Sequence, residues 1–104
     1  MEMDRGELRA AIKNDKIQWQ KHALERMMER GISRDAVKDV LLSGELIENY
    51  PDDRPYPSAL FYGLLKGDPF HVVAALDQNS GYCFIITTYR PDTEHFEPDF
   101  KTRR

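Results

Sequence analysis

The chain has 104 residues, of which 40% are hydrophobic and 32% are charged, and its formal net charge is −3. This composition favours one packed domain and argues against a wholly disordered chain. The negative net charge excludes the uniformly basic surface of a protein that coats nucleic acid, although a local cationic cleft is compatible with it. No apolar run approaches the roughly 20 residues that span a bilayer, so we expect no membrane partner. The single cysteine, Cys83, favours a reducing cytoplasm.

The first part of the chain has the periodicity of helices. Asp4 is a suitable N-cap for a short first helix, in which apolar residues recur at helical spacing. Residues 14–15 end this helix. Residues 17–20 alternate between apolar and polar side chains, which is typical of a short extended segment.

Two further helices are predicted before residue 44. Residues 21–30 are strong helix formers throughout, and Gly31 is a natural C-cap. Ser33 is the expected N-cap of the next helix, because a serine side chain accepts a hydrogen bond from the first free backbone N–H groups. Gly44 ends this helix.

Four strand-like runs follow, at residues 46–50, 59–65, 70–76 and 82–89. The turns between the last three runs are short, which favours an antiparallel sheet because a parallel crossover needs about a dozen linking residues. The loop at residues 51–57 contains three prolines, so it cannot pair as a central strand. The predicted fold is therefore α+β, with N-terminal helices packed on a four-stranded antiparallel sheet.

The chain changes character once, near Gly44, and each half is too small to fold well alone. We therefore expect a single domain over residues 1–104, with a core at about 17–92 and a polar C-terminal tail at 91–104. Phe96 and Phe100 are the side chains that would anchor this tail to the body.

Metal and thiol chemistry have little support in the sequence. The single cysteine, Cys83, excludes an internal disulfide, and its apolar neighbours indicate a small buried residue. His22, His71 and His95 are widely spaced and form none of the close pairs typical of metal ligands. We expect neither a metal nor a cofactor.

The helix at residues 21–30 carries His22, Arg26 and Arg30 four residues apart, so these side chains share one stripe at the edge of its apolar face. Guanidinium groups offer planar pairs of donors to a phosphodiester, and an imidazole can move a proton near neutral pH. The alternative is a solvated helix face with Glu–Arg ion pairs.

Polar residues also lie at the ends of two predicted strands. His71 stands near the start of the third run, and Thr88, Tyr89 and Arg90 stand at the end of the fourth. A polar cluster at the end of an apolar strand is a common place for a functional site. The alternatives are a structural histidine and a strand that simply ends in solvent.

Tyr56 and Ser58 border the proline-rich loop at residues 51–57. A tyrosine at this place could stack on a base or donate a hydrogen bond to a phosphate. It could equally hold the loop against the body of the protein.

Four motifs occur in order along the chain: His22-Ala23-x-x-Arg26-Met27-x-x-Arg30-Gly31-Ile32-Ser33, Tyr50-Pro51-Asp52-Asp53-x-Pro55-Tyr56-Pro57-Ser58, His71-Val72-Val73 and Thr88-Tyr89-Arg90-Pro91-Asp92. Together they resemble a bacterial and archaeal family of domains of unknown function, whose genes often lie beside a gene for a YgiT-type zinc-finger antitoxin. That family is regarded as a group of toxins related to RelE-like and BrnT-like ribonucleases. The resemblance runs from about residue 22 to the C-terminus.

The resemblance implies a RelE-like fold and a toxin of a type II toxin–antitoxin system. It also implies metal-independent cleavage of RNA, either free or as ribosome-bound mRNA, and neutralisation by a zinc-finger-type antitoxin. It leaves open whether the chain forms a homodimer. RelE-like relatives differ in their catalytic residues, so the roles of individual residues must come from chemistry.

A ribonuclease of this kind lets the RNA 2′-hydroxyl attack the neighbouring phosphate, which requires a base, an acid and cations that stabilise the phosphorane. The predicted catalytic residues are His22, Arg26, His71, Tyr89 and Arg90. The predicted RNA-binding residues are Arg30, Tyr56, Ser58 and Thr88. This site requires His22 and His71 to lie on the same side of the fold.

Two other functions are compatible with the sequence. The chain could be a non-catalytic module that binds another protein, with the proline-rich loop as its contact surface. It could also be an inactive relative with a structural or regulatory role. The acidic balance of the chain is a departure from strongly basic ribosome-dependent toxins, because each phosphate contact needs local positive charge.

Overall fold

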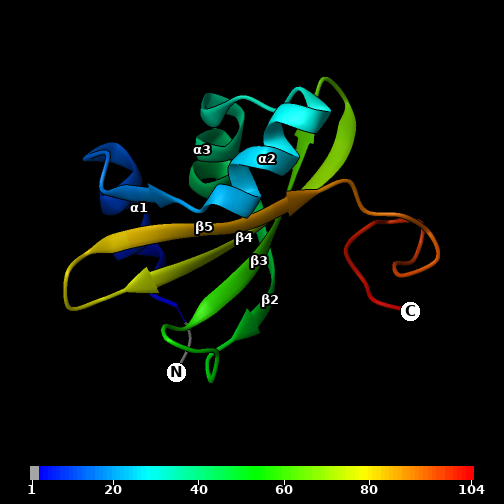
Figure 1. Ribbon diagram of the computed structural model, residues 1–104. Coiled ribbons are helices and arrows are strands. Elements are labelled where there is room, and N and C mark those ends of the chain that lie inside the picture. Colours follow the sequence, from blue (N-terminus) through cyan, green and yellow to red (C-terminus); the bar gives the residue numbers. More distant parts are fainter. Residues whose placement is uncertain (1–2) are drawn as a thin grey trace.

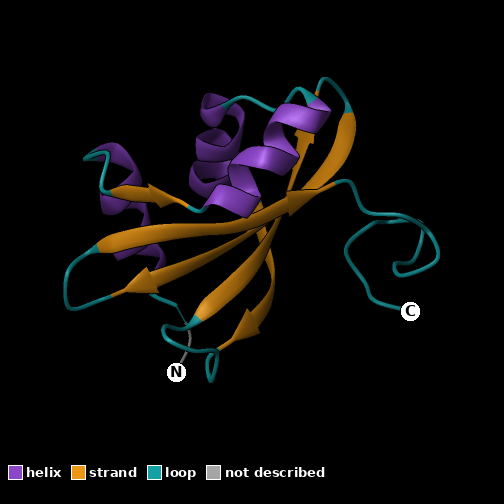
Figure 2. Ribbon diagram, in the orientation of Figure 1, coloured by secondary structure: helices purple, strands orange, loops and turns teal. Residues whose placement is uncertain are grey.

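The computed structural model describes residues 3–104 and has an α+β fold, in which helices pack on a single β-sheet (Figures 1 and 2). The helices are α1 (Arg5–Lys13), α2 (Lys21–Arg30) and α3 (Arg34–Ser43). Their ends follow the predicted caps. Asp4 and Ser33 accept hydrogen bonds from backbone N–H groups in the first turns of α1 and α3, and Gly31 ends α2 in the left-handed region, with φ of 66°.

The sheet has five strands: β1 (Ile17–Trp19), β2 (Glu45–Tyr50), β3 (Ser58–Leu65), β4 (Asp68–Asp77) and β5 (Tyr82–Tyr89). Their order across the sheet is β1-β5-β4-β3-β2. The strands β2 to β5 pair antiparallel, as predicted.

The prediction of a four-stranded antiparallel sheet is wrong, because β1 adds a fifth strand parallel to β5. Ile17 pairs with Cys83, so almost the whole domain lies between the two partners along the chain. A parallel pair needs a long crossover, and here α2, α3 and three strands supply it. The sheet is therefore mixed.

The two faces of the sheet have different coverings. Val72, Ala74 and Ile85 belong to the same buried core as the apolar side chains of the three helices. The opposite side of the sheet, which we call the open face, carries the side chains that alternate with this set. Its residues on the three central strands include Tyr62, His71, Val73, Ala75, Phe84, Thr87 and Tyr89.

A β-bulge in β5 sets which side chains reach the open face. Ala74 pairs with Ile85 and Val73 pairs with Thr87, so Ile86 is the extra residue. A bulge shifts the alternation by one position. Phe84 and Tyr89 therefore share the open face, although they are five positions apart and regular alternation would put them on opposite faces.

The tail after β5 contains an isolated bridge between Phe96 and Arg103 (Figure 1). Phe96 is 2% exposed and packs edge-on against the ring of His71, with 4.6 Å between ring centroids. The tail therefore docks on the open face at the end of the sheet where His71 lies.

No helix in the described part of the chain has both the length and the apolar character that crossing a membrane requires.

The contact between α3 and β3 predicts the effect of one substitution. A methyl group at Gly63 would overlap the Val40 side chain, so we expect Gly63→Ala to destabilise the fold by about 1–3 kcal/mol through overpacking. Leu64→Ala is the matched control, since Leu64 is 61% exposed and its loss should change stability by less than about 0.5 kcal/mol. Urea unfolding of both variants measures the difference, and equal stabilities would contradict the close packing.

Candidate functional site

A cleft of about 370 Å³ opens where the C-terminal ends of α2 and β5 meet the tail. We call it the arginine cleft. Its lining residues are Arg30, Tyr89, Arg90, Pro91, Asp92, His95, Phe96 and Arg103. Three of the predicted site residues, Arg30, Tyr89 and Arg90, therefore come together in one place.

Three separate segments supply the guanidinium groups of this cleft. Arg30 is the last residue of α2, Arg90 directly follows β5, and Arg103 lies near the end of the tail. The ends of α2 and β5 thus fix the backbone positions of Arg30 and Arg90. The docking of the tail brings Arg103 to these two residues.

The arginine cleft has an excess of positive charge. Arg90 pairs with Asp68 at 3.5 Å, and Arg103 pairs with Glu48 at 3.0 Å, but neither carboxylate lines the cleft. Asp92 is the one carboxylate in the lining. Since guanidinium groups bind phosphate oxygens through paired N–H donors, this arrangement suits a phosphodiester.

Contacts on the sheet orient Arg103. Its guanidinium lies over the ring of Phe96, 4.9 Å from the centroid. Hydrogen bonds to Tyr50 and Glu48 raise the pKa of Arg103 and keep the side chain charged. Residues of the edge strand β2 therefore hold the Arg103 side chain in position.

His95 and Asp92 form a pair at the rim of the cleft. His95 Nδ1 lies 2.8 Å from Asp92 Oδ1, and that oxygen also accepts hydrogen bonds from the backbone N–H groups of Glu94 and His95. These bonds, the one from the His95 ring above all, lower the pKa of Asp92. An ionised carboxylate only accepts hydrogen bonds, so Nδ1 carries the proton and Nε2 of the exposed ring is free to accept one.

The sequence prediction missed His95. It considered this histidine only as a metal ligand and found no partner histidine at a suitable spacing. The usable signal was Asp92, which stands three residues before His95 and directly after Arg90-Pro91, where a turn can close the pair.

His71 is fully buried and both of its ring nitrogens have partners. Nε2 lies 2.6 Å from the Phe100 carbonyl oxygen and donates to it, so Nδ1 accepts a hydrogen bond from the Tyr89 hydroxyl at 3.2 Å. Burial lowers the pKa of His71. The ring joins the tail to β4 and β5 and does not reach solvent, which favours the structural interpretation over a catalytic one.

The expectation of one cleft shared by His22 and His71 is wrong. His22 lies in the first turn of α2, which packs on the helix side of the sheet, whereas His71 points to the open face. The sheet therefore separates the two rings. Arg26 pairs with Glu29 at 3.2 Å on the half-exposed surface of α2, as the solvated-face alternative expects.

Two predicted RNA contacts are also wrong in this structure, because their side chains are buried. Thr88 is 0% exposed on the helix side of β5. Ser58 is 1% exposed and donates a hydrogen bond to Asp53, at 2.6 Å. Tyr56 is half-buried and stacks on Phe84, so it stays accessible to a ligand.

Cys83 is buried, and burial raises the pKa of its thiol to about 12. The interpretation of Cys83 as a small core residue is confirmed. Within residues 3–104, no group of three or more His, Cys, Asp or Glu side chains gathers in a way that could hold a metal ion.

A family model described as "Domain of unknown function (DUF4258)" matches residues 19–90. The chain therefore belongs to this family, and the matched part runs from the end of β1 to Arg90. No curated protein and no solved structure matches the chain.

The buried ring of His71 predicts a pH dependence of stability. Its folded-state pKa lies below the unfolded value of about 6.5, so the unfolded chain binds the proton more readily as the pH falls. The contribution of neutral His71 is fully present above about pH 6.5, and we expect the free energy of unfolding to decrease below it.

Urea unfolding across this range measures the effect. His71→Gln should be less stable than the wild type at neutral pH and should lose less stability on acidification. His22→Gln, a change at an exposed histidine, should retain the wild-type slope. Parallel pH profiles for wild type and His71→Gln would contradict this account.

Proposed function

We propose that this member of the DUF4258 family is a toxin-type, metal-independent endoribonuclease that cleaves RNA in the arginine cleft. The observation that carries the proposal is the meeting of Arg30, Arg90 and Arg103 with the His95–Asp92 pair in one cleft. These groups supply the two requirements of the reaction, a site for charge and a group that moves a proton.

In the proposed reaction, Nε2 of His95 takes the proton of the RNA 2′-hydroxyl while that oxygen bonds to the adjacent phosphorus. The bond from phosphorus to the 5′-oxygen then breaks, and the protonated His95 returns the proton to this leaving oxygen. The products are a 2′,3′-cyclic phosphate and a 5′-hydroxyl. Asp92 keeps the proton on Nδ1 and stabilises the imidazolium that forms.

The arginines stabilise the phosphorane, which carries more negative charge than the phosphodiester. Arg30 and Arg90 are exposed at the cleft, and Arg90 can exchange its exposed contact with Asp68 for a phosphate, whereas Arg103 is held in place by Glu48. A fixed cation and two mobile ones suit a site that binds a flexible single strand and then stabilises one phosphate.

The RelE-like fold belongs to the same proposal. Helices on one side of the sheet and an open face on the other support it, although the parallel strand β1 is an addition to the expected four strands. A toxin of this kind requires a neutralising partner, and the resemblance of the motifs to a family encoded beside zinc-finger antitoxins suggests its type. The partner and the substrate are both parts of the proposal.

The role of His95 is tested by His95→Gln, which we expect to lower the rate of RNA cleavage by about 100- to 10,000-fold because the proton carrier is lost. His22→Gln is the matched control and should keep the wild-type rate, since α2 holds His22 away from the cleft. Mapping of RNA 5′ ends after induced expression, with growth followed in parallel, measures the effect.

Two results would reject this assignment. Equal loss of cleavage in both variants would place the chemistry elsewhere. Folded wild-type protein that neither cleaves RNA nor arrests growth would favour the non-catalytic binding module or the inactive relative.

The cleft also predicts a salt dependence of binding. A 2′-O-methyl RNA lacks the attacking hydroxyl and so reports binding alone. Arg90→Gln should weaken its binding and reduce the slope of log K against log salt by about 0.7, the value for one phosphate contact of a single strand. Arg26→Gln, on the surface of α2 outside the cleft, should leave the slope unchanged. Fluorescence anisotropy at several salt concentrations measures both, and equal slopes would contradict phosphate binding by Arg90.

A further inference from the structure

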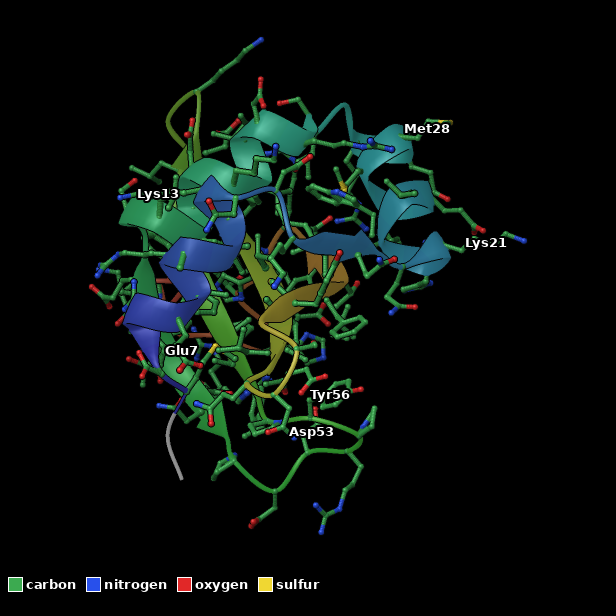
Figure 3. All side chains as sticks on the ribbon, turned by 90° about the vertical axis from the view of Figure 1, so that its left-hand side faces the viewer. Glu7, Lys13, Lys21, Met28, Asp53 and Tyr56 are labelled. Carbon is green, nitrogen blue, oxygen red and sulfur yellow. The ribbon has the colours of Figure 1, made fainter. Side chains whose placement is uncertain are left out.

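A second cavity, of about 290 Å³, lies on the open face below the proline-rich loop. Its lining residues are Gln20, Asp53, Arg54, Pro55, Tyr56, Ala75, Phe84 and Ile86. The walls are thus mainly apolar or aromatic, with three polar side chains at the rim. Figure 3 shows Tyr56 and Asp53 close together, on the side of the molecule away from Met28 of α2. We call this the aromatic cavity.

The aromatic wall is a stacked pair. The rings of Tyr56 and Phe84 lie 5.2 Å apart between centroids, with 16° between their planes. The stacking contact and the position of Phe84 on β5 hold both rings in place. A planar ligand would therefore meet a wall whose orientation is already fixed, which reduces the entropy cost of binding.

The aromatic cavity and the arginine cleft lie along the same strand. Phe84 lines the first, Tyr89 lines the second, and the bulge at Ile86 puts both side chains on the open face. They are five positions apart on an extended strand, which is roughly 16 Å. A short RNA strand can span this distance, whereas a single nucleotide cannot fill both places.

The rim of the cavity supplies hydrogen-bonding groups for the edge of a base. Gln20 is the N-cap residue of α2, but its side chain makes no capping hydrogen bond and is free for a ligand. The Asp53 carboxylate accepts from Ser58 and from the Arg54 backbone, and it retains lone pairs for a further donor. Cytosine, adenine and guanine present an exocyclic amino group to this acceptor, whereas both exocyclic groups of uracil are themselves acceptors.

We propose that the aromatic cavity binds a nucleobase of the same RNA strand whose phosphate lies in the arginine cleft, with preference for a base that carries an amino group over uracil. The inference rests on the proposed function, since it needs the RNA strand to be bound at the cleft. Stacking on Tyr56 and Phe84 supplies affinity, and Asp53 supplies the preference. The cavity would then set which nucleotide stands at a fixed distance from the cleaved bond.

The test uses a short 2′-O-methyl oligocytidine and a set of versions in which one base after another is removed. We expect one abasic position to weaken binding to the wild type by about 5- to 100-fold, as loss of one base–aromatic stack does. Replacing that same cytosine by uracil should weaken binding less, and Asp53→Asn should reduce the difference between the two bases.

Phe84→Leu keeps an apolar side chain but loses the ring. It should weaken binding of the intact oligocytidine by the same factor as the abasic position, with no further loss when both changes are combined. Tyr82→Leu is the matched control, because Tyr82 is an aromatic residue of the same strand that does not line the cavity. Thermal unfolding of each variant separates loss of the cavity from loss of the fold.

The outcomes distinguish this inference from the proposed function. If Phe84→Leu leaves RNA affinity unchanged while His95→Gln still abolishes cleavage, the inference is wrong and the ribonuclease stands; an aromatic side chain of a partner protein as the occupant would give this result. Independent, additive losses from Phe84→Leu and from every abasic position would also reject it. If the wild type binds and cleaves no RNA, both proposals fail together.

Discussion

The hydrogen bond from His71 Nε2 to the Phe100 carbonyl oxygen holds the tail on the sheet, and the arginine cleft depends on it. Five of the cleft's lining residues come from the tail: Pro91, Asp92, His95, Phe96 and Arg103. While Nε2 donates this bond, the other ring nitrogen accepts a hydrogen bond from the Tyr89 hydroxyl, so β5 and the tail are linked through one ring. A buried polar group with both partners satisfied specifies a single arrangement, because any other leaves a ring nitrogen unpaired.

The docking of the tail explains how a chain of negative net charge can form a site for phosphate. The chain carries 15 Lys and Arg residues against 18 Asp and Glu residues, so its overall field does not attract RNA. Folding places three arginines from distant segments around one cleft and pairs two of them with carboxylates that stand outside it. Binding strength at such a site comes from local geometry, and not from long-range attraction.

Local patterns in the sequence predict most of the secondary structure. Asp4, Ser33 and Gly31 cap helices because their chemistry acts within one turn, and the four longer strands follow from apolar runs between short turns. The pairing of β1 with β5 was not predictable in this way, and neither was the place on the sheet where the tail docks, since both join segments that are distant along the chain. Phe96 was expected to anchor the tail because it is an apolar residue in a polar segment, and it is buried.

The candidate site also combines residues that local sequence patterns predict with residues that depend on the tertiary fold. Arg30 was identified from its spacing with His22 and Arg26 on one helix, and Arg90 from the polar cluster at the end of a strand. Both signals are local, and both residues line the cleft. The separation of His22 from His71 depends on which side of the sheet each element occupies, and the importance of His95 depends on the path of the tail. The His95–Asp92 pair has a local signal in the sequence, but the sequence does not show that the tail brings this pair to the arginines. The bulge at Ile86, which brings Phe84 and Tyr89 to one face, is equally invisible in the apolar run of β5.

The parallel pairing of β1 with β5 has a consequence for the newly made protein. Ile17 and Cys83 can meet only after the strands between them have been synthesised, so the edge of the sheet closes late and the folding of the domain has a high contact order. The tail follows β5, and its residues complete the cleft after that closure. A nascent chain on the ribosome would therefore carry an incomplete cleft until the tail has been synthesised.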